Sequence, residues 1–93
     1  MPRPCRRRRI RGKPSSFYFK PAGVRMIDLE NSKLTIDEFE AIRLKDFLNL
    51  EQIACAEKME ISQPTFNRIL TSARKKIADA IINGKAIEIE KKN

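Results

Sequence analysis

The sequence predicts a mostly α-helical domain of three helices, with a basic N-terminal arm and a small two-stranded β element. Three observations lead to this expectation. Apolar residues recur at helical spacing through two long segments. Cap residues mark where the helices begin, and only two short stretches have the character of strands. A chain of 93 residues has room for one domain with one small core.

The first 14 residues are the predicted arm. The chain has a net charge of +8, and this segment contains seven basic residues and no acid, so the rest of the chain has a net charge of only +1. The seven are Arg3, Arg6, Arg7, Arg8, Arg9, Arg11 and Lys13. Such a run repels itself, so we expect residues 1–14 to be a flexible arm that orders on a polyanion, outside a packed domain of residues 15–93. A solubility tail is the alternative.

Two segments are expected to be strands that pair with each other. Residues 15–23, "SSFYFKPAG", contain the aromatic run Phe17, Tyr18 and Phe19 and end in a Pro and Gly turn. Residues 85–90, "KAIEIE", alternate between apolar and charged side chains, which is typical of a half-buried strand. The aromatic run could also stack on nucleic-acid bases. We expect core and ribbon packing instead, since stacking platforms usually sit on larger sheets. Because a two-stranded ribbon is marginal alone, it should pack against the helices or continue into a partner subunit.

The first helix is predicted to begin at Ile36. Thr35 and Glu38 form a capping box, in which each side chain binds the other residue's backbone N–H, and Leu34 can pack on Phe39 across this start. The helix then has a broad apolar surface, made up of Phe39, Ile42, Leu44, Phe47 and Leu48.

Residues 49–51, "NLE", interrupt this period, and a short helix is expected from Gln52 to Lys58. Its side chains Ala54, Cys55 and Ala56 are small, which allows the axis of a neighbouring helix to approach closely.

The third helix is predicted over residues 62–83. Ser62 is a favoured N-cap, Pro64 suits the first turn, and Gly84 follows as a left-handed stop. The expected buried stripe consists of Phe66, Ile69, Leu70, Ala73, Ile77, Ala80 and Ile81.

The short helix, the turn and the polar start of the next helix together predict a helix-turn-helix whose second helix enters the DNA major groove. Gln63 and Asn67 have amides that can pair with adenine, Arg68 can contact guanine or a phosphate, and Thr65 can contact a thymine methyl group or a phosphate. The predicted DNA-binding residues are Ser62, Gln63, Pro64, Thr65, Asn67, Arg68, Thr71, Arg74, Lys75, Arg6, Arg7, Arg8, Arg9 and Arg11. Arg74, Lys75 and Lys76 are expected on backbone phosphates. A solvated helix face is the alternative.

The segment "LEQIACAEKMEISQPTFNRILTSARKKI" resembles the helix-turn-helix of sigma factor region four. Nearly the whole chain, through "MPRP", "FKPAG", "LTIDEFEAIRL" and "NGKAIEI", resembles a family of small prokaryotic predicted DNA-binding proteins of unknown function. The resemblance implies a sigma-like fold and a nucleic-acid role, but no target. Glycine is usual in this motif where Glu60 stands, because the backbone there commonly takes a positive φ, so we expect the turn either to form with some strain or to be rearranged. Glu51 stands where a hydroxyl cap is common, which weakens the start of its helix.

The composition gives little support for catalysis. The chain lacks histidine and has only three glycines, so the commonest general base and metal ligand and any glycine-rich phosphate loop are missing. We expect no enzyme activity, no metal and no cofactor. Cys5 and Cys55 are expected to be free thiols, with a redox role for Cys5 as the alternative. No apolar run could span a membrane, so a cytoplasmic protein is expected.

The sequence thus predicts a sequence-specific DNA-binding protein that regulates transcription, with double-stranded DNA as its partner. It is expected to form a homodimer through the end of the long helix, at Ile77, Ile81 and Ile82, and the terminal strand. Two alternatives remain open. One is a protein-interaction module that contacts RNA polymerase, and the other is an RNA-binding protein that uses the arginine-rich arm. The operator sequence, any effector and the direction of regulation do not follow from the sequence.

Overall fold

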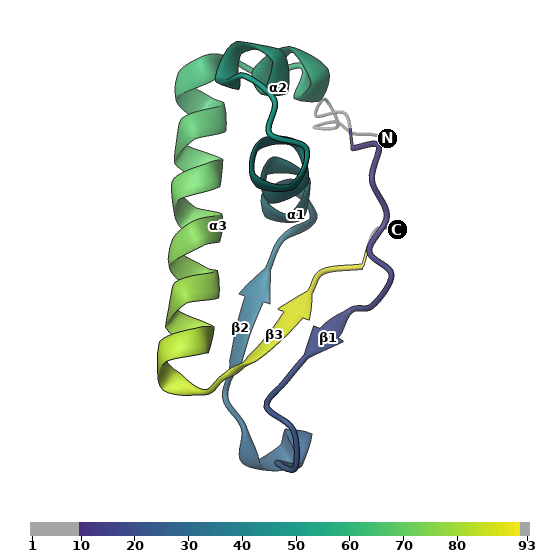
Figure 1. Ribbon diagram of the computed structural model, residues 1–93, viewed down its shortest axis with the longest axis vertical. Coiled ribbons are helices and arrows are strands. Elements are labelled where there is room, and N and C mark those ends of the chain that lie inside the picture. The colour runs from purple at the N-terminus through teal and green to yellow at the C-terminus, as the bar shows by residue number, and fades with distance from the viewer. Residues whose placement is uncertain (1–9, 92–93) are drawn as a thin grey trace, which may run out of the picture.

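Residues 10–91, the part of the chain that the computed structural model describes, contain three α-helices, a three-stranded sheet and a short 3₁₀ turn at Met26–Asp28 (Figure 1). The helices are α1 (Ile36–Ile42), α2 (Gln52–Met59) and α3 (Gln63–Asn83), and the strands are β1 (Tyr18–Phe19), β2 (Asn31–Leu34) and β3 (Ala86–Ile89). α3 runs along one side of the molecule, with α1 and α2 beside its first half and the sheet beside its second half. None of the helices in residues 10–91 is long and apolar enough to cross a membrane.

α3 begins and ends where the sequence predicts. The Ser62 hydroxyl accepts a hydrogen bond from the Thr65 N–H at 3.3 Å, and Gly84 ends the helix in the left-handed conformation at φ +68°. Most of the expected stripe is buried or half-buried. Ile81 is the exception: it is 71% exposed, so its placement in the buried stripe is wrong. Neither the sheet nor the other helices cover that side of the last turns.

α1 has the predicted capping box, because the Glu38 N–H donates to Thr35 Oγ1 at 3.2 Å and the Thr35 N–H donates to Glu38 Oε1 at 2.8 Å. The helix then widens into a π-helical turn, Arg43–Phe47, which the sequence does not predict. The Leu48 N–H bonds to the carbonyl oxygen of Arg43, five residues earlier, and this shifts the phase of the helical face. Phe47 is therefore 81% exposed and Leu48 is exposed too, in contrast to the broad buried surface expected.

The sheet has three strands in the order β1-β3-β2, so the predicted two-stranded element is wrong in number. β1 pairs antiparallel with β3, with Tyr18 opposite Glu88, which confirms the expected pairing. β3 also pairs in parallel with β2, from Asn31 opposite Ala86 to Leu34 opposite Ile89. β2 has the polar sequence "NSKL", which lacks the β-branched and aromatic residues that usually indicate a strand.

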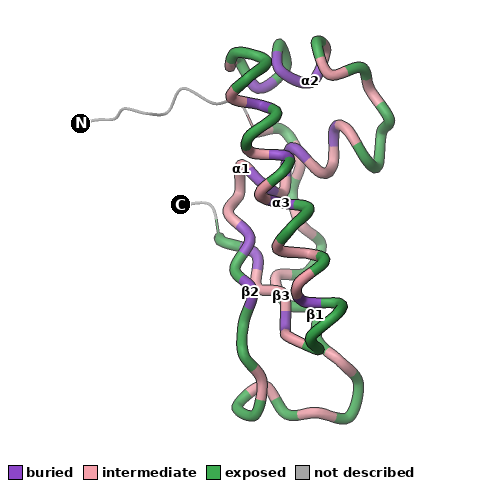
Figure 2. Tube along the Cα trace, turned by 90° about the vertical axis from the view of Figure 1, so that its left-hand side faces the viewer, coloured by how far each residue is buried: buried purple, intermediate pink, exposed green. Residues whose placement is uncertain are grey.

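The buried apolar residues, purple along the trace in Figure 2, form two clusters. The first lies among α1, the π-helical turn, α2 and α3, and contains Ala41, Leu44, Cys55, Ala56, Met59, Phe66 and Leu70. The second lies between α3 and the sheet, around Leu34, Ala73 and Ile89. Ile10 packs against the first cluster, so the packed body begins before the expected boundary at Ser15. Residues 1–9 lie outside the described residues. Cys55 is a free buried thiol, and burial raises its pKa.

Candidate nucleic-acid interface

α2 and α3 meet at a tight corner formed by Glu60 and Ile61. Glu60 takes the left-handed conformation with φ +60° and ψ +46°, so of the two expected outcomes the turn forms with a positive φ and is not rearranged. The Glu60 N–H donates to the carbonyl oxygen of Glu57, and the Ile61 N–H donates to that of Ala56, each at 3.0 Å. These bonds satisfy the carbonyl groups at the end of α2. Buried Cys55, Ala56 and Met59 bring α2 against Phe66 in the first turn of α3.

The start of α3 presents the predicted polar residues on its outer side. Ser62, Gln63, Pro64, Asn67, Arg68 and Thr71 are exposed, and Thr65 is half-buried. Thr65 Oγ1 accepts hydrogen bonds from the Ser62 hydroxyl at 2.9 Å and from Arg68 Nη2 at 3.2 Å. The first two turns of α3 therefore combine uncharged donors and acceptors with one guanidinium group. We refer to Ser62, Gln63, Pro64, Thr65, Asn67, Arg68 and Thr71 as the α3 polar face.

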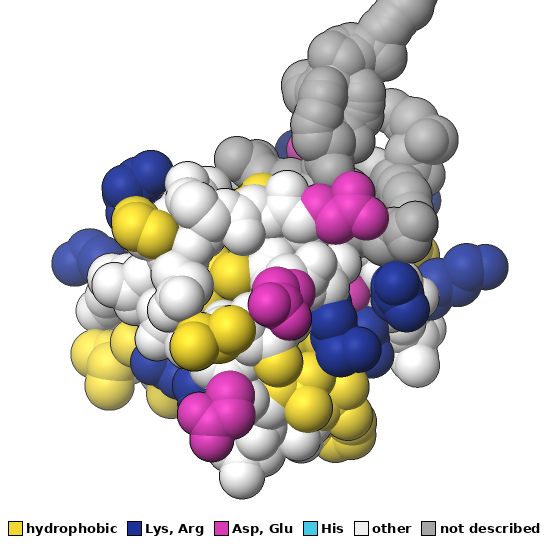
Figure 3. All heavy atoms as spheres, turned by 90° about the horizontal axis from the view of Figure 1, so that it is seen from above, with side chains coloured by type: hydrophobic (Ala, Val, Ile, Leu, Met, Phe, Trp, Pro, Cys, Tyr) yellow, Lys and Arg dark blue, Asp and Glu magenta, His cyan; other side chains and the backbone are white. Residues whose placement is uncertain are grey.

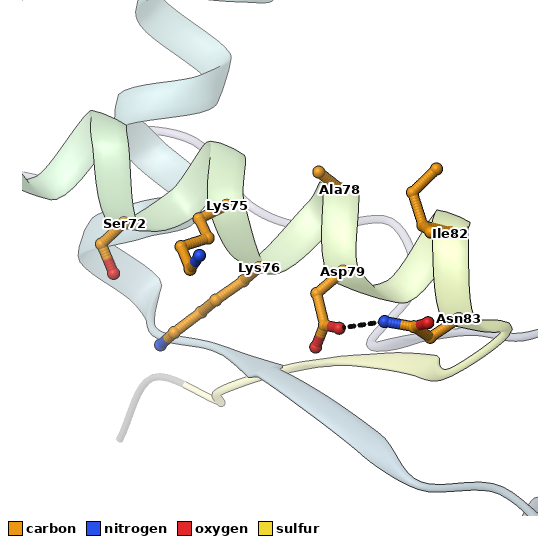
Figure 4. A pocket seen from close by; sticks show the side chains of 7 residues that line it. All are labelled: Ser72, Lys75, Lys76, Ala78, Asp79, Ile82 and Asn83. Carbon is orange, nitrogen blue, oxygen red and sulfur yellow. Dashed lines mark hydrogen bonds between the residues drawn. The ribbon is translucent and has the colours of Figure 1, made fainter.

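The three basic residues farther along α3 do not share one environment. Arg74 is paired with Asp46 of the π-helical turn, with Nε to Oδ2 at 3.0 Å and Nη2 to Oδ1 at 2.5 Å, and this pairing lowers the pKa of Asp46. Lys76 donates to Glu38 of α1 at 2.8 Å. Lys75 is exposed and borders a hollow of about 530 Å³ on the outer side of α3, together with Ser72, Lys76, Ala78, Asp79, Ile82 and Asn83 (Figure 4). Of these three, only Lys75 has no hydrogen bond or ion pair with another residue in the described part of the chain, although its charge helps to lower the pKa of nearby Asp79.

Glu38 ties α3 to α1 through a buried carboxylate. It accepts hydrogen bonds from the Ser72 hydroxyl at 2.5 Å and from Lys76 Nζ at 2.8 Å, in addition to its capping bond to Thr35. Burial alone would raise the pKa of Glu38, but these hydrogen bonds outweigh burial and hold it below its usual range. Ser72 and Lys76 therefore belong to the α1 contact and lie beside the α3 polar face.

Charge at this end of the molecule is mixed. Figure 3 looks down onto α2 and the start of α3, where Lys and Arg side chains lie mainly toward the rim and acidic side chains lie nearer the middle. Glu51, Glu57 and Glu60 are exposed in or next to α2. Because residues 14–93 have a net charge of only +1, a strong positive field here depends on the basic residues before Pro14. Of these, Arg6, Arg7, Arg8 and Arg9 lie outside the described residues, whereas Arg11 is described and exposed.

Residues 1–92 match the profile of the family described as "Protein of unknown function DUF134". The chain belongs to this DUF134 family. Similar proteins include a UPF0251 protein of Caldanaerobacter subterraneus subsp. tengcongensis, 57% identical over 97% of this chain and 76% of its own length. Another is a UPF0251 protein of Dehalococcoides mccartyi strain BAV1, 54% identical over 97% of this chain and 77% of its own length. These names state no activity. No solved structure matches this DUF134 chain.

The ion pairs that Glu40 and Asp46 form with basic residues were not predicted from the sequence of this DUF134 chain. Glu40 is buried in α1, where its carboxylate binds Arg43 and the backbone of residues 11 and 12. A signal was available, since Glu40 lies four residues before Leu44 and one before Ala41, on the helical face that a core would occupy. The pairing of Asp46 with Arg74 has no such signal, because it depends on the unpredicted π-helical turn.

Proposed function

We propose that this protein is a sequence-specific DNA-binding protein that regulates transcription, with α2 and α3 as a helix-turn-helix. The observation that carries the proposal is the α3 polar face. It places Gln63, Asn67 and Arg68, whose side chains can pair with base edges, on the exposed outer side of one helix start. Glutamine and asparagine amides suit adenine, and a guanidinium group suits guanine. An ordinary solvated helix face is richer in Glu and Lys.

The supporting structure is suited to a major-groove reader. α3 is 21 residues long, about 32 Å at 1.5 Å per residue. Its polar face precedes the contact that α1 makes with it through Glu38 and Ser72, and α2 packs on the inner side of the first turn through Phe66. The first two turns therefore have a free outer side while their inner side is held by a packed core. That arrangement gives the base-reading side chains a rigid base.

Fewer residues of α3 are available to bind DNA phosphates than the sequence suggested. Arg74 and Lys76 are already paired with Asp46 and Glu38, so each would have to exchange an acidic partner for a phosphate. Lys75 is exposed and forms no ion pair with residues 10–91, so within that part of the chain it has no acidic partner to exchange. The arginines of the arm, Arg6 to Arg9, are the main phosphate-binding residues of this proposal.

The experiment is selection of duplexes from a random DNA pool by the full-length protein, followed by sequencing of the retained DNA at about 150 mM salt. A shared motif is expected, and the double variant Gln63→Ala and Asn67→Ala should lose it. Lys33→Ala, a change at an exposed residue of β2, is the control and should keep the motif. A pool with no enriched motif, together with tighter binding to a structured RNA hairpin, would replace this proposal with RNA binding.

One observation favours a second candidate, a protein-interaction module that contacts RNA polymerase. The apolar side chains of Phe47, Leu48 and Ile53, in and next to the π-helical turn and α2, are exposed. Exposed large apolar side chains are common at protein contacts. In this case the chain would bind the purified polymerase, and Phe47→Ser would weaken that binding without changing the enriched DNA motif.

A further inference from the structure

The carboxylate of Glu40 is the centre of a buried polar site between α1 and the N-terminal segment. Glu40 is 1% exposed. Arg43 binds it with two hydrogen bonds, Nε to Oε1 at 2.8 Å and Nη2 to Oε2 at 2.9 Å. Its remaining acceptor sites receive the backbone N–H groups of Arg11 at 3.1 Å and Gly12 at 3.2 Å. A buried carboxylate with four donors has all its hydrogen-bonding needs met. Removal of any donor would therefore leave a buried acceptor unpaired, which costs folding free energy.

Gly12 is the residue that allows the backbone to come this close. A Cβ atom at position 12 would lie 2.2 Å from Arg43 Nε, 2.3 Å from Arg43 Cδ and 3.0 Å from Glu40 Oε1. The guanidinium group cannot move aside freely, because it is held by the buried carboxylate. The close fit therefore depends on the absence of a side chain at this position.

Ile10 adds an apolar contact one residue before the polar one. It packs against the cluster that contains Met59, Cys55 and Phe66, the residues that join α2 to α3. The N-terminal segment thus reaches the end of the molecule that bears α2 and the start of α3, as Figure 1 also shows.

We propose that Glu40 and Arg43 form an anchoring site for the basic arm, which fixes Ile10 to Gly12 on the body so that Arg6 to Arg9 act on the DNA that the α3 polar face reads. Glu40, Arg43 and Gly12 are then positioning residues for DNA binding and do not contact DNA. The inference rests on the proposed function and deepens it.

The anchor limits how far the arginine run can be from the body, whatever conformation residues 6–9 take. Consecutive extended residues span at most about 3.6 Å, so Arg6 lies within about 14 Å of Ile10. The anchor therefore sets an upper limit on the distance between these arginines and the body. Anchoring raises their effective concentration at the bound duplex, because fewer residues between the anchor and the charges remain free. Because the body has a net charge of only +1, most of the attraction to DNA would depend on where these arginines lie.

Hydrogen exchange tests the anchor without DNA. In the full-length protein, the amides of Arg11 and Gly12 should exchange at least about tenfold more slowly than the amide of exposed Lys13, since they donate to a buried carboxylate. Gly12→Ala should remove this protection, whereas the matched control Ser15→Ala should retain it. Equally fast exchange at residues 11, 12 and 13 in the parent protein would overturn the anchor, regardless of any result with DNA.

Duplex binding tests the positioning role. Gly12→Ala should weaken binding to the enriched duplex about tenfold and leave its salt slope nearly unchanged, because the same arginines remain available but are held less well. Ser15→Ala should bind as the parent does. Arg43→Lys keeps the positive charge but cannot bind the carboxylate with two hydrogen bonds, and should weaken binding in the same direction. Circular dichroism checks that each variant is folded.

The outcomes separate the two proposals. Slow exchange at Arg11 and Gly12 with no duplex binding by the parent protein would support the anchor, overturn its role in DNA binding and refute the proposed function. Duplex binding that is equal in the parent protein and in folded Gly12→Ala, with exchange protection lost in the variant, would overturn the positioning role and leave the DNA reader intact. Weaker binding by Gly12→Ala with an unchanged slope would support both.

Discussion

Single residues set two local properties of the α2 and α3 corner. Glu60 holds the left-handed conformation that a tight corner needs, although an L side chain is disfavoured there by about 1 kcal/mol. Arg68 lies in the second turn of α3, where its guanidinium group donates a hydrogen bond to Thr65 Oγ1 and remains exposed. Glu60 therefore affects the stability of the fold, and Arg68 affects the proposed reading of bases.

Glu60→Gly should stabilise the protein. Glycine takes a positive φ without steric cost, although it also raises the entropy of the unfolded chain, so we expect a net gain of about 0.5–1 kcal/mol in the free energy of unfolding. Asn49→Gly is the matched control at φ +61°, and it should gain less because asparagine tolerates this conformation. Urea unfolding of the three proteins measures the difference. A loss of stability on Glu60→Gly would show that its side chain contributes more than the strain costs.

Arg68→Ala should lose about 1–3 kcal/mol of binding free energy on the enriched duplex and relax the preference at one base pair, if the guanidinium group reads a base. Titration of the enriched duplex and of single-base variants measures both effects. Lys75→Ala, farther along the same helix, should instead weaken binding by a similar factor on all sequences. The same uniform loss for Arg68→Ala would make Arg68 a phosphate contact.

At the scale of elements, buried carboxylates on α1 hold the other parts of the domain. Glu38 joins α1 to α3 through Ser72 and Lys76, and Glu40 joins α1 to the N-terminal segment. Burial alone would raise the pKa of Glu40, but Arg43 and the N–H groups of residues 11 and 12 outweigh it and hold the pKa below its usual range. Both carboxylates are therefore charged in the folded protein at neutral pH.

These two groups give stability a defined pH dependence. Because their pKa values are lower in the folded protein than in the unfolded chain, their stabilising effect is fully present above the ordinary glutamate value of about 4.5. It is lost as the pH falls through the folded values. Glu38→Gln should cost about 1–3 kcal/mol near pH 7 and make the acid limb of the stability curve shallower. Exposed Glu57→Gln is the control. An unchanged acid limb in Glu38→Gln would refute this account.

At the scale of the whole molecule, the net charge and the folded domain belong to different parts of the chain. The arm has nearly all of the net charge, and the folded body has almost none. The sheet and α3 form the elongated half of that body. β3 lies between β1 and β2, so the terminal strand offers no free edge for the subunit contact that the sequence suggested. The end of α3 still has Ile82, which is 79% exposed.

Deletion of residues 2–9 should flatten the salt dependence of DNA binding while the body stays folded, because Ile10 and Gly12 are kept. For every phosphate that the shortened protein no longer neutralises, the slope of log K against log salt should become less steep by about 0.9. Titrations of one duplex between about 50 and 200 mM salt measure the slope. An unchanged slope would reduce the arm to a solubility tail.

The dimer remains a prediction, now limited to the end of α3. Two copies joined there would present paired α3 polar faces, and spacing of about 34 Å would match one turn of DNA. Sedimentation at micromolar concentration should show a dimer for the parent protein and a monomer for Ile82→Glu, with Glu57→Gln as a control that stays dimeric. A monomeric parent protein would leave a monomeric reader.

The sequence by itself determined the three helices, their caps and the strand character of the first and last strands. These features depend on local chemistry, such as the Thr35 capping box, Ser62 and Gly84, and on the period of apolar residues. It also placed the α3 polar face, because exposure on a helix follows from the residues opposite it. Each of these signals lies within a few residues of the feature it predicts.

Only the tertiary structure decided the features that join distant segments. β2 is a strand because β3 supplies its hydrogen bonds, although its own sequence has little strand preference. Three other features also depend on contacts between distant segments. They are the π-helical turn that exposes Phe47, the pairing of Arg74 with Asp46, and the binding of residues 10–12 to α1. A buried carboxylate such as Glu40 must find donors wherever the fold brings them, and its partners at Arg11 and Gly12 lie 29 and 28 residues away in the chain.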